Sequence, residues 1–380
     1  MDLLGLPFLL VMVGISLLVA VGTAAVWNRW PSGLRWPARG LSLVLVMAVG
    51  ACLAGTAVNR AFGLYGSFGE LWGSPSARFD PVGSFGVPAA TTRLEILTPQ
   101  WNDVGRQDAA LGRGSMLRVR LGGPRSGITR IGLLYLPAAY FTDVSVRLPA
   151  VEFFHGTPGG PRNYTDQLHV ADVLDREIAS GRVPPLIGVF PMIDDGRAGE
   201  CVNGTRGPHD ETYLAVDVPA DVDVGLRALP GRSFAVLGYS TGGFCAVNLG
   251  LRHPDRYVAA GSISGYFLAG TDPAVGNPYG RSVELRESNS PQWVVANRRP
   301  SAPPLYVVSS AGDPGSVAAE RSFVAETRRR DPRLVLGAAL VPGGGHTFAS
   351  WEAALAPTLD WVARYLPRDL APPIVLPRLP

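Results

Sequence analysis

A serine between two glycines is the residue of this sequence whose surroundings most clearly suggest chemistry. Ser240 is the third residue of Gly-Tyr-Ser-Thr-Gly, which joins a short apolar run to an apolar stretch with helical character. This strand–turn–helix order is that of a nucleophile elbow, in which the serine hydroxyl stands above the edge of a sheet. The turn is tight enough that Gly238 and Gly242 have a steric reason to be small. We therefore expect Ser240 to be a nucleophile; the alternative is a turn whose serine only caps the following helix.

His346 is the histidine best placed to act as general base for Ser240. It lies in a glycine-rich loop, after the strand-like residues 334–341 and before an amphipathic helix expected at 350–366. A loop of this kind can bring the imidazole to the serine hydroxyl. The other four histidines are poorer candidates, because they lie in helical patterns, in a polar loop or beside a glycine turn: His155, His169, His209 and His253.

Asp313 is the acid expected to orient the His346 imidazole and to stabilise its cation. It comes soon after the buried strand pattern 304–310, and an acid just past the carboxyl end of a parallel strand lies at the active edge of the sheet. Glu320, in the following helix, and Asp272, in the loop after the preceding strand, are the alternatives. The chain order serine, aspartate, histidine is that of α/β hydrolases and differs from the order in trypsin-like and subtilisin-like proteases.

Backbone N–H groups for a developing oxyanion are expected at two places. The apolar residues 148–154 lead into His-Gly-Thr-Pro-Gly-Gly, and a His-Gly loop after an early strand supplies one such donor in hydrolases of this kind. We assign this donor to Thr157 and the second donor to Thr241, the residue after Ser240. For the first segment, the alternative is a plain Gly/Pro turn between a strand and a helix.

These motifs together resemble a known family. The segments LPAVEFFHGTPGG, GYSTGGFCAVNLGLRHPDRY, YVVSSAGD and GGGHTFASWEAALAPTLDWV are similar to the putative-esterase family of α/β hydrolases, which includes esterase D-like enzymes, enterochelin esterases and mycobacterial mycolyltransferases. The resemblance covers about residues 115–366. It implies a Ser–acid–His triad at Ser240, Asp313 and His346, no metal or other cofactor, and esterase or acyl-transfer activity. Some members of the family have glutamate as the acid at this stage of the chain.

Alternating strand and helix patterns predict the fold class. Such alternation is typical of a mostly parallel sheet flanked by helices, here an α/β-hydrolase domain at residues 91–366. An antiparallel entry hairpin, built from part of 91–121 and from 131–136, should precede it. Later helices and strands are expected at 170–178, 185–192, 212–229 and 259–267. The composition of residues 63–90 indicates a linker, and that of residues 367–380 indicates an extended proline-rich tail.

The N-terminal region has the composition of a membrane anchor. Residues 3–27 carry no charge and are about long enough to cross a bilayer, and residues 41–58 form a second uncharged run at the lower length limit. The segment between them contains three arginines near tryptophans: Arg29, Arg35 and Arg39. Arginine in a short loop predicts a cytoplasmic side. Residues 1–62 should therefore form two transmembrane helices, with the remaining chain extracytoplasmic. A cleaved signal peptide fits less well, since the first run has no basic start.

The three cysteines fall into two groups. Cys52 lies in the second apolar run, where a thiol behaves as a small hydrophobic group; its surroundings only loosely resemble a lipoprotein cleavage site. Cys245 is five residues after Ser240, and Cys201 lies in the loop after the preceding strand. That loop emerges beside the elbow in a parallel sheet, and an extracytoplasmic location permits oxidation. We expect a Cys201–Cys245 disulfide, with two buried free thiols as the alternative.

Charge excludes one class of partner and leaves the substrate open. All basic residues are arginines, the net charge of +3 is small for 380 residues, and there is no basic tract, so nucleic-acid binding has no support. The expected function is a membrane-anchored, extracytoplasmic serine hydrolase that passes an acyl group from an ester to water or to a sugar or lipid hydroxyl. A catalytically silent envelope-binding module on the same fold is the alternative. Residues 193–211 and 266–300 should shape the pocket. Nothing in the sequence indicates the oligomeric state.

Overall fold

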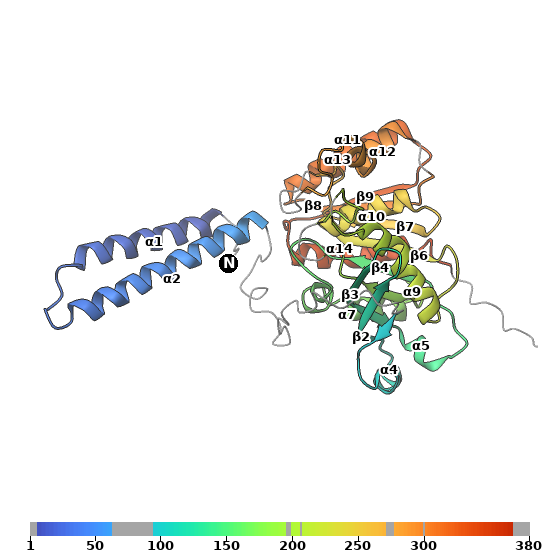
Figure 1. Cartoon of the computed structure of the whole chain (residues 1–380), viewed down its shortest axis with the longest axis horizontal. Helices are drawn as coiled ribbons and strands as arrows, with labels where there is room; N and C mark the ends of the chain where they lie inside the picture. Colours follow the sequence, from blue (N-terminus) through green and yellow to red (C-terminus); the bar gives the residue numbers. More distant parts are fainter. Residues whose placement is uncertain are drawn as a thin grey trace, which may run out of the picture.

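A helical hairpin and an α/β domain make up the protein in this computed structural model (Figure 1), which describes residues 6–62, 94–194, 199–205, 207–270, 277–298 and 301–367. The expected tail lies almost wholly outside the described residues, and the expected linker lies entirely outside them. The family-like segments all belong to the α/β domain, so the sheet of this domain is described first.

Nine strands form one mixed sheet among the described residues. They are β1 (Glu95–Ile96), β2 (Ser115–Gly123), β3 (Ile128–Leu136), β4 (Ala150–Phe154), β5 (Ile187–Phe190), β6 (Phe234–Tyr239), β7 (Tyr257–Ile263), β8 (Leu305–Ser310) and β9 (Leu336–Val341). Their order is β1-β2-β3-β5-β4-β6-β7-β8-β9. The pairs β1–β2, β2–β3 and β3–β5 are antiparallel. The pairs β5–β4, β4–β6, β6–β7, β7–β8 and β8–β9 are parallel. The predicted mostly parallel sheet with an antiparallel entry hairpin is confirmed.

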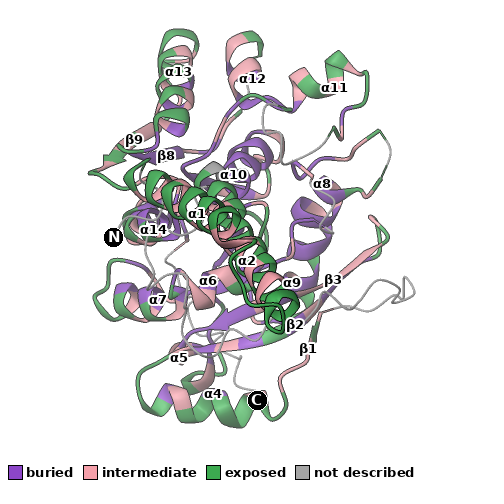
Figure 2. Cartoon of the chain, turned by 90° about the vertical axis from the view of Figure 1, so that its left-hand side faces the viewer, coloured by how far each residue is buried: buried purple, intermediate pink, exposed green. Residues whose placement is uncertain are grey.

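Helices of the α/β domain cover both faces of this sheet, and the first two helices of the chain form the hairpin. The helices are α1 (Leu6–Val26), α2 (Arg35–Phe62), α4 (Trp101–Ala110), α5 (Ala138–Thr142), α6 (Arg162–Asp166), α7 (Val170–Ala179), α8 (Asp210–Thr212), the π-helical turn η1 (Tyr213–Asp217), α9 (Val218–Gly225), α10 (Thr241–Arg252), α11 (Val283–Ser288), α12 (Pro291–Asn297), α13 (Pro314–Arg330) and α14 (Phe348–Ala363). One apolar core joins the sheet to residues of α9, α10, α12 and α13, and a second joins it to α7 and α14. Figure 2 shows the buried residues gathered along the strands and the inner helix faces.

The helix expected at 212–229 is divided into three pieces. Pro219 has no N–H to donate to the carbonyl four residues earlier, and the chain is π-helical directly before it. The carboxylate of Asp221 accepts the Gly122 N–H at 2.8 Å, and that of Asp217 accepts the Ser126 N–H at 2.8 Å. These buried acids fasten the irregular helix to the β2–β3 hairpin. The apolar periodicity was visible in the sequence, but this anchoring depends on residues 91 and 99 positions away.

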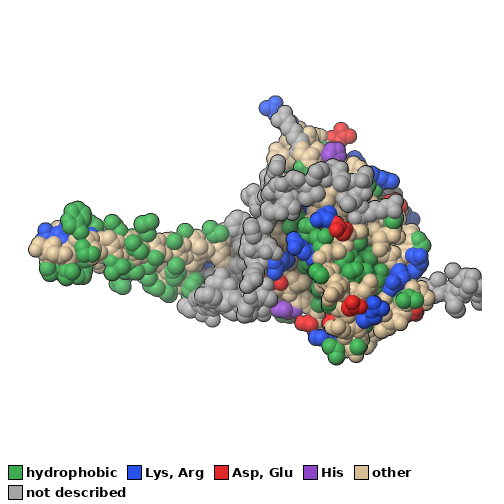
Figure 3. All heavy atoms as spheres, turned by 60° about the horizontal axis from the view of Figure 1, so that its bottom comes forward, with side chains coloured by type: hydrophobic (Ala, Val, Ile, Leu, Met, Phe, Trp, Pro, Cys, Tyr) green, Lys and Arg blue, Asp and Glu red, His purple; other side chains and the backbone are tan. Residues whose placement is uncertain are grey.

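Two N-terminal helices, α1 and α2, are long and apolar enough to cross a membrane. They lie side by side, and Figure 3 shows hydrophobic side chains along them with basic side chains at the tip. The second helix begins at Arg35, inside the segment expected to be a loop. Arg39 explains this difference: its guanidinium donates to the Trp27 carbonyl and the Asn28 side chain. These bonds close the turn early, and Pro37 is tolerated in a first helical turn.

Candidate active site

The connection from β6 to α10 holds Ser240 in an unusual backbone conformation. Its φ is 54° and its ψ is −125°, a region that residues other than glycine rarely adopt. The adjacent glycines have no room for a side chain: a Cβ on Gly238 would lie 2.4 Å from the Gly242 carbonyl, and one on Gly242 would lie 2.0 Å from the Phe154 oxygen. The turn therefore has the tight strand-to-helix form that the sequence predicted for it.

Three side chains from the carboxyl edge of the sheet form one hydrogen-bonded chain. The Ser240 Oγ is 2.9 Å from the His346 Nε2, and the His346 Nδ1 is 2.7 Å from the Asp313 Oδ2. Ser240 follows β6, Asp313 follows β8, and His346 follows β9. Because a carboxylate only accepts, Nδ1 carries the proton and Nε2 is left to accept from the serine hydroxyl. The structure thus brings together the three residues singled out from the sequence.

Asp313 has a second task, which fixes its orientation. It is the N-cap of α13, and its Oδ1 accepts the Ser316 N–H at 3.2 Å. Burial alone would raise the pKa of Asp313, but the hydrogen bond and charge interaction with His346 and the bonds from Ser316 outweigh it, so the pKa is lowered. The carboxylate therefore stays ionised beside the imidazole. The Ser316 hydroxyl donates to the Ser264 carbonyl and lies 3.5 Å from the His346 Nδ1.

Of the two alternative acids, Glu320 is not at this position. Glu320 is buried on α13 and makes its hydrogen bond to Ser309; burial raises its pKa to about 7. Asp272 lies outside the described residues. Three of the other histidines have partners elsewhere: His155 Nε2 accepts the Ile193 N–H, His169 contacts Glu352 and His253 contacts Glu211. Among the described residues, Asp313 is therefore the acid hydrogen-bonded to His346.

The loop after β4 passes directly against the elbow. A Cβ on Gly156 would lie 3.0 Å from the Ser240 Cβ, which places Thr157 one residue from this contact. The Thr157 hydroxyl donates to Asp194 at 3.1 Å, and the buried His155 bridges the loops after β4 and β5. Burial lowers the pKa of His155, so this bridge is neutral. Thr241 begins α10 at the positive end of that helix. Thr241 thus follows Ser240 directly, and Thr157 is one residue away from the contact between Gly156 and Ser240.

An aromatic wall supports the histidine. The Trp351 ring meets the His346 ring edge-on at 5.0 Å and stacks on Tyr239 at 4.6 Å. Tyr239 is the residue before Ser240, so this wall couples the position of the imidazole to that of the elbow. Trp351 belongs to the family-like segment GGGHTFASWEAALAPTLDWV, whereas Ser316 was not among the residues predicted from the sequence. The Asp-x-x-Ser spacing at a helix start is the signal that would have indicated Ser316.

A disulfide and a buried carboxylate hold the neighbouring loops. The structure joins Cys201 to Cys245 on α10. The adjacent Glu200 is fully buried and accepts hydrogen bonds from the Tyr266 hydroxyl at 2.7 Å, from the Gly270 N–H at 2.8 Å and from the Tyr279 hydroxyl. The two segments expected to shape the pocket therefore contact each other. In the described part of the chain, no group of three or more His, Cys, Asp or Glu side chains could hold a metal ion.

Comparisons with known proteins agree with this architecture. The family described as Putative esterase matches residues 129–362, well over half of the chain. An uncharacterized protein of Corynebacterium glutamicum is 25% identical over 268 residues, which are 66% of this chain and 62% of that protein. This chain therefore matches less than two thirds of that relative's length.

Two solved structures share the fold. A ferulic acid esterase has a TM-score of 0.59 at 20% identity, over 67% of this chain and 99% of that chain. The fluorophosphonate-binding serine hydrolase F of Staphylococcus aureus has a TM-score of 0.56 at 17% identity, over 66% and 99%. The family match runs from β3 to α14 and includes the loops where Ser240, Asp313 and His346 meet. The chain therefore belongs to the Putative esterase family of α/β hydrolases.

Proposed function

We propose that this protein is a serine hydrolase that cleaves carboxylic esters through an acyl-enzyme. The observation that carries the proposal is the unbroken hydrogen-bonded chain from the Ser240 Oγ through His346 to Asp313, in a chain of an esterase family. Nucleophile, base and orienting acid are the three parts that acyl transfer by a serine requires.

The first half-reaction forms the acyl-enzyme. The Ser240 Oγ attacks the ester carbonyl carbon while its proton moves to the His346 Nε2, and the carbonyl oxygen becomes an oxyanion. The backbone N–H groups of Thr157 and Thr241 hold this oxyanion. Asp313 stabilises the imidazolium across the 2.7 Å bond. The tetrahedral intermediate then collapses: the C–O bond to the alcohol breaks, and the Nε2 proton goes to the departing oxygen.

In the second half-reaction, His346 takes a proton from the acceptor, whose oxygen attacks the acyl carbon and releases Ser240. Water as acceptor gives an acid and hence an esterase. A sugar or lipid hydroxyl gives a new ester and hence an acyltransferase. Both outcomes use the same acyl-enzyme, so the acceptor is chosen by the groups around the site and not by the triad.

Trapping the acyl-enzyme site is the direct test of this function. A fluorophosphonate should add one phosphonyl group to the protein, seen as a single mass increase in intact-mass spectrometry and mapped to Ser240 by peptide sequencing. Pre-incubation with a p-nitrophenyl ester should slow the labelling. If the enzyme can transfer the acyl group to a sugar, adding a sugar acceptor such as trehalose should increase the release of p-nitrophenol. Ser240→Ala is the matched control. An intact protein that takes no label and cleaves no ester would instead favour a silent binding module.

We also propose that α1 and α2 anchor the domain to the cell membrane with the triad outside. The apolar length of both helices supports this, as do Arg29 at the tip and the disulfide in the α/β domain. A reporter that is active only outside the cytoplasm, fused after Pro380, should be active. The same reporter fused after Gly33, in the short loop, should be silent. Activity from the loop fusion and silence from the other would reverse the topology.

A further inference from the structure

A surface depression of about 500 Å³ lies beside the loop that follows β7. Its lining includes Gly270, Asn277, Tyr279, Arg281 and Arg286. Both arginines are exposed, and among the described residues neither guanidinium has an ion pair or a side-chain hydrogen bond. Their positive charge is therefore accessible to a ligand, although the acidic residues Glu284 and Glu287 of α11 are close in sequence.

The loop that borders the depression starts at the catalytic edge of the sheet. The loop leading to it begins at Ser264, whose carbonyl accepts from the Ser316 hydroxyl next to His346. Two residues later, Tyr266 stacks on Phe244 of the elbow helix with ring centroids 4.7 Å apart. The buried carboxylate of Glu200 then joins Tyr266 to Gly270 and Tyr279, which line the depression. The segment that carries the two arginines is therefore held in place by contacts with the elbow helix α10.

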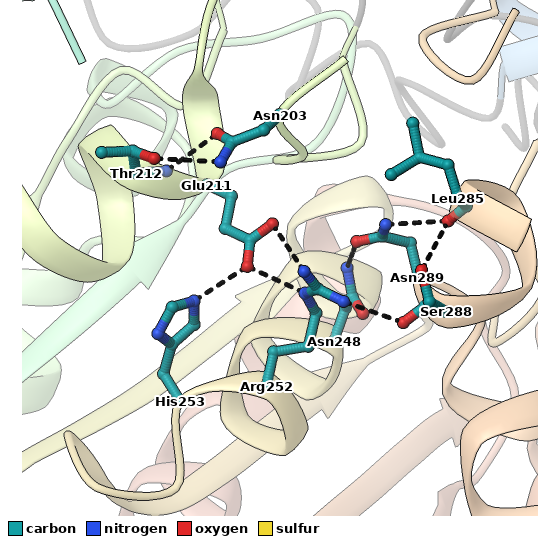
Figure 4. Close-up of polar contacts among 9 residues, drawn as sticks. All are labelled: Asn203, Glu211, Thr212, Asn248, Arg252, His253, Leu285, Ser288 and Asn289. Atoms are coloured by element: carbon teal, nitrogen blue, oxygen red, sulfur yellow. Dashed lines mark hydrogen bonds and ion pairs between the residues drawn. The ribbon is translucent and has the colours of Figure 1, made fainter. Parts of the chain in front are cut away.

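The other side of the depression, formed by α11, is held in place as well, as Figure 4 shows. Arg252 at the end of α10 donates to the Ser288 carbonyl of α11 at 3.1 Å, and Asn248 donates to Asn289 at 3.1 Å. Glu211 holds Arg252 through both carboxylate oxygens and also contacts His253. These contacts hold the short helix that carries Arg286 against the C-terminal half of α10, the helix whose N-terminus follows Ser240.

Two guanidinium groups on a fixed wall suit an anion. Guanidinium matches phosphate and carboxylate oxygens in pairs, is charged at every relevant pH, and gives stronger hydrogen bonds to ionised acceptors than to neutral ones. We propose that Arg281 and Arg286 form a subsite for a phosphate or carboxylate group carried by the ester substrate. The inference rests on the proposed esterase function and adds the charge of the substrate to it.

Matched ester pairs test this subsite. One pair is a butyryl ester of glycerol and the same ester of glycerol 3-phosphate; the other is p-nitrophenyl butyrate and p-nitrophenyl hemisuccinate. The wild-type protein should prefer the anionic member of at least one pair, measured as the ratio of kcat/KM values, and the pair shows whether the charge belongs to the alcohol or to the acyl part. The double variant Arg281→Gln/Arg286→Gln should lower this ratio about tenfold, mainly through KM, because exposed charge pairs contribute modestly each. Added salt should lower the wild-type ratio too.

The control variant is Arg298→Gln/Arg321→Gln, which removes the same charge from exposed arginines of the same region outside the depression. It should leave the ratio within twofold of wild type. Titration of glycerol 3-phosphate and inorganic phosphate into Ser240→Ala provides a readout without turnover. Loss of the preference in the control variant, no preference in the wild type, or binding of phosphate without any substrate preference would each overturn the subsite. Absence of turnover of every ester, neutral ones included, would instead contradict the proposed function.

Discussion

Replacing Ser240 or His346 by alanine should lower kcat for an activated ester about 10⁶-fold, with the double variant little worse than either single one. The reason is that the two side chains act as a unit through the 2.9 Å contact between Oγ and Nε2. A serine without its base is a weak nucleophile, and a base without the serine has no hydroxyl proton to accept. Removal of the serine or of the histidine of such a triad costs about as much as removal of all three members. The measurement is steady-state hydrolysis of p-nitrophenyl butyrate by purified variants.

Ser180→Ala and His169→Ala are matched controls for this experiment. Both residues are exposed, the Ser180 hydroxyl donates to the Glu177 carbonyl, and His169 contacts Glu352. Each control should keep turnover close to the wild-type value. The nucleophile assignment is wrong if the Ser240→Ala protein turns over ester at a near-normal rate. Additive losses in the double variant would show that the two residues act independently.

Asp313→Asn should lower kcat about 10⁴-fold while KM changes little. The amide keeps the size of the carboxylate but carries no charge to stabilise the imidazolium, and it favours the wrong histidine tautomer. Asparagine is as good an N-cap as aspartate, so the Ser316 N–H at the start of α13 keeps its acceptor. Thermal unfolding should therefore change little, which separates a loss of chemistry from a loss of fold. Kinetics and the melting temperature of the same preparation are the two measurements.

Glu320→Gln and Asp272→Asn serve as companions to Asp313→Asn. Glu320 is hydrogen-bonded to Ser309 and not to His346, so its replacement should be near neutral for turnover, and we expect the same for Asp272. An Asp313→Asn protein that keeps more than about a tenth of wild-type turnover would place the acid elsewhere. The companion that then loses activity would identify it, and the pairing of Ser240 with His346 would remain.

The parts of the fold that were predictable from the sequence are those with local causes. The run 234–239 is buried throughout, and glycine occupies the two elbow positions, Gly238 and Gly242, where a Cβ would lie within 2.4 Å of backbone. Strand, turn and helix could therefore be identified together. The start of α2 and the π-helical turn η1 were not predicted, because they depend on Arg39 reaching back to Trp27 and on Asp217 reaching the β2–β3 hairpin.

The site shows the same division. Strand ends that carry a serine, an acid and a histidine meet at one edge of a parallel sheet, so Ser240, Asp313 and His346 could be nominated without contacts. By contrast, the carboxylate of Glu200 binds donors from residues 266–279, and nothing near it in sequence indicates these partners. The open guanidinium groups of Arg281 and Arg286 are likewise a property of the assembled loops, since an exposed arginine alone carries no information about its partner.

The disulfide makes the stability of this domain depend on the compartment in which the chain resides. Cys201 and Cys245 are 44 residues apart, and the loop that they close contains all of β6 and the elbow. Closing a loop of this length removes unfolded-chain entropy equivalent to about 4 kcal/mol, a large share of the roughly 5–15 kcal/mol that keeps a domain folded. Before oxidation, the chain lacks this contribution and is easier to unfold. After oxidation, the same bond works as a latch that opposes return to the unfolded state.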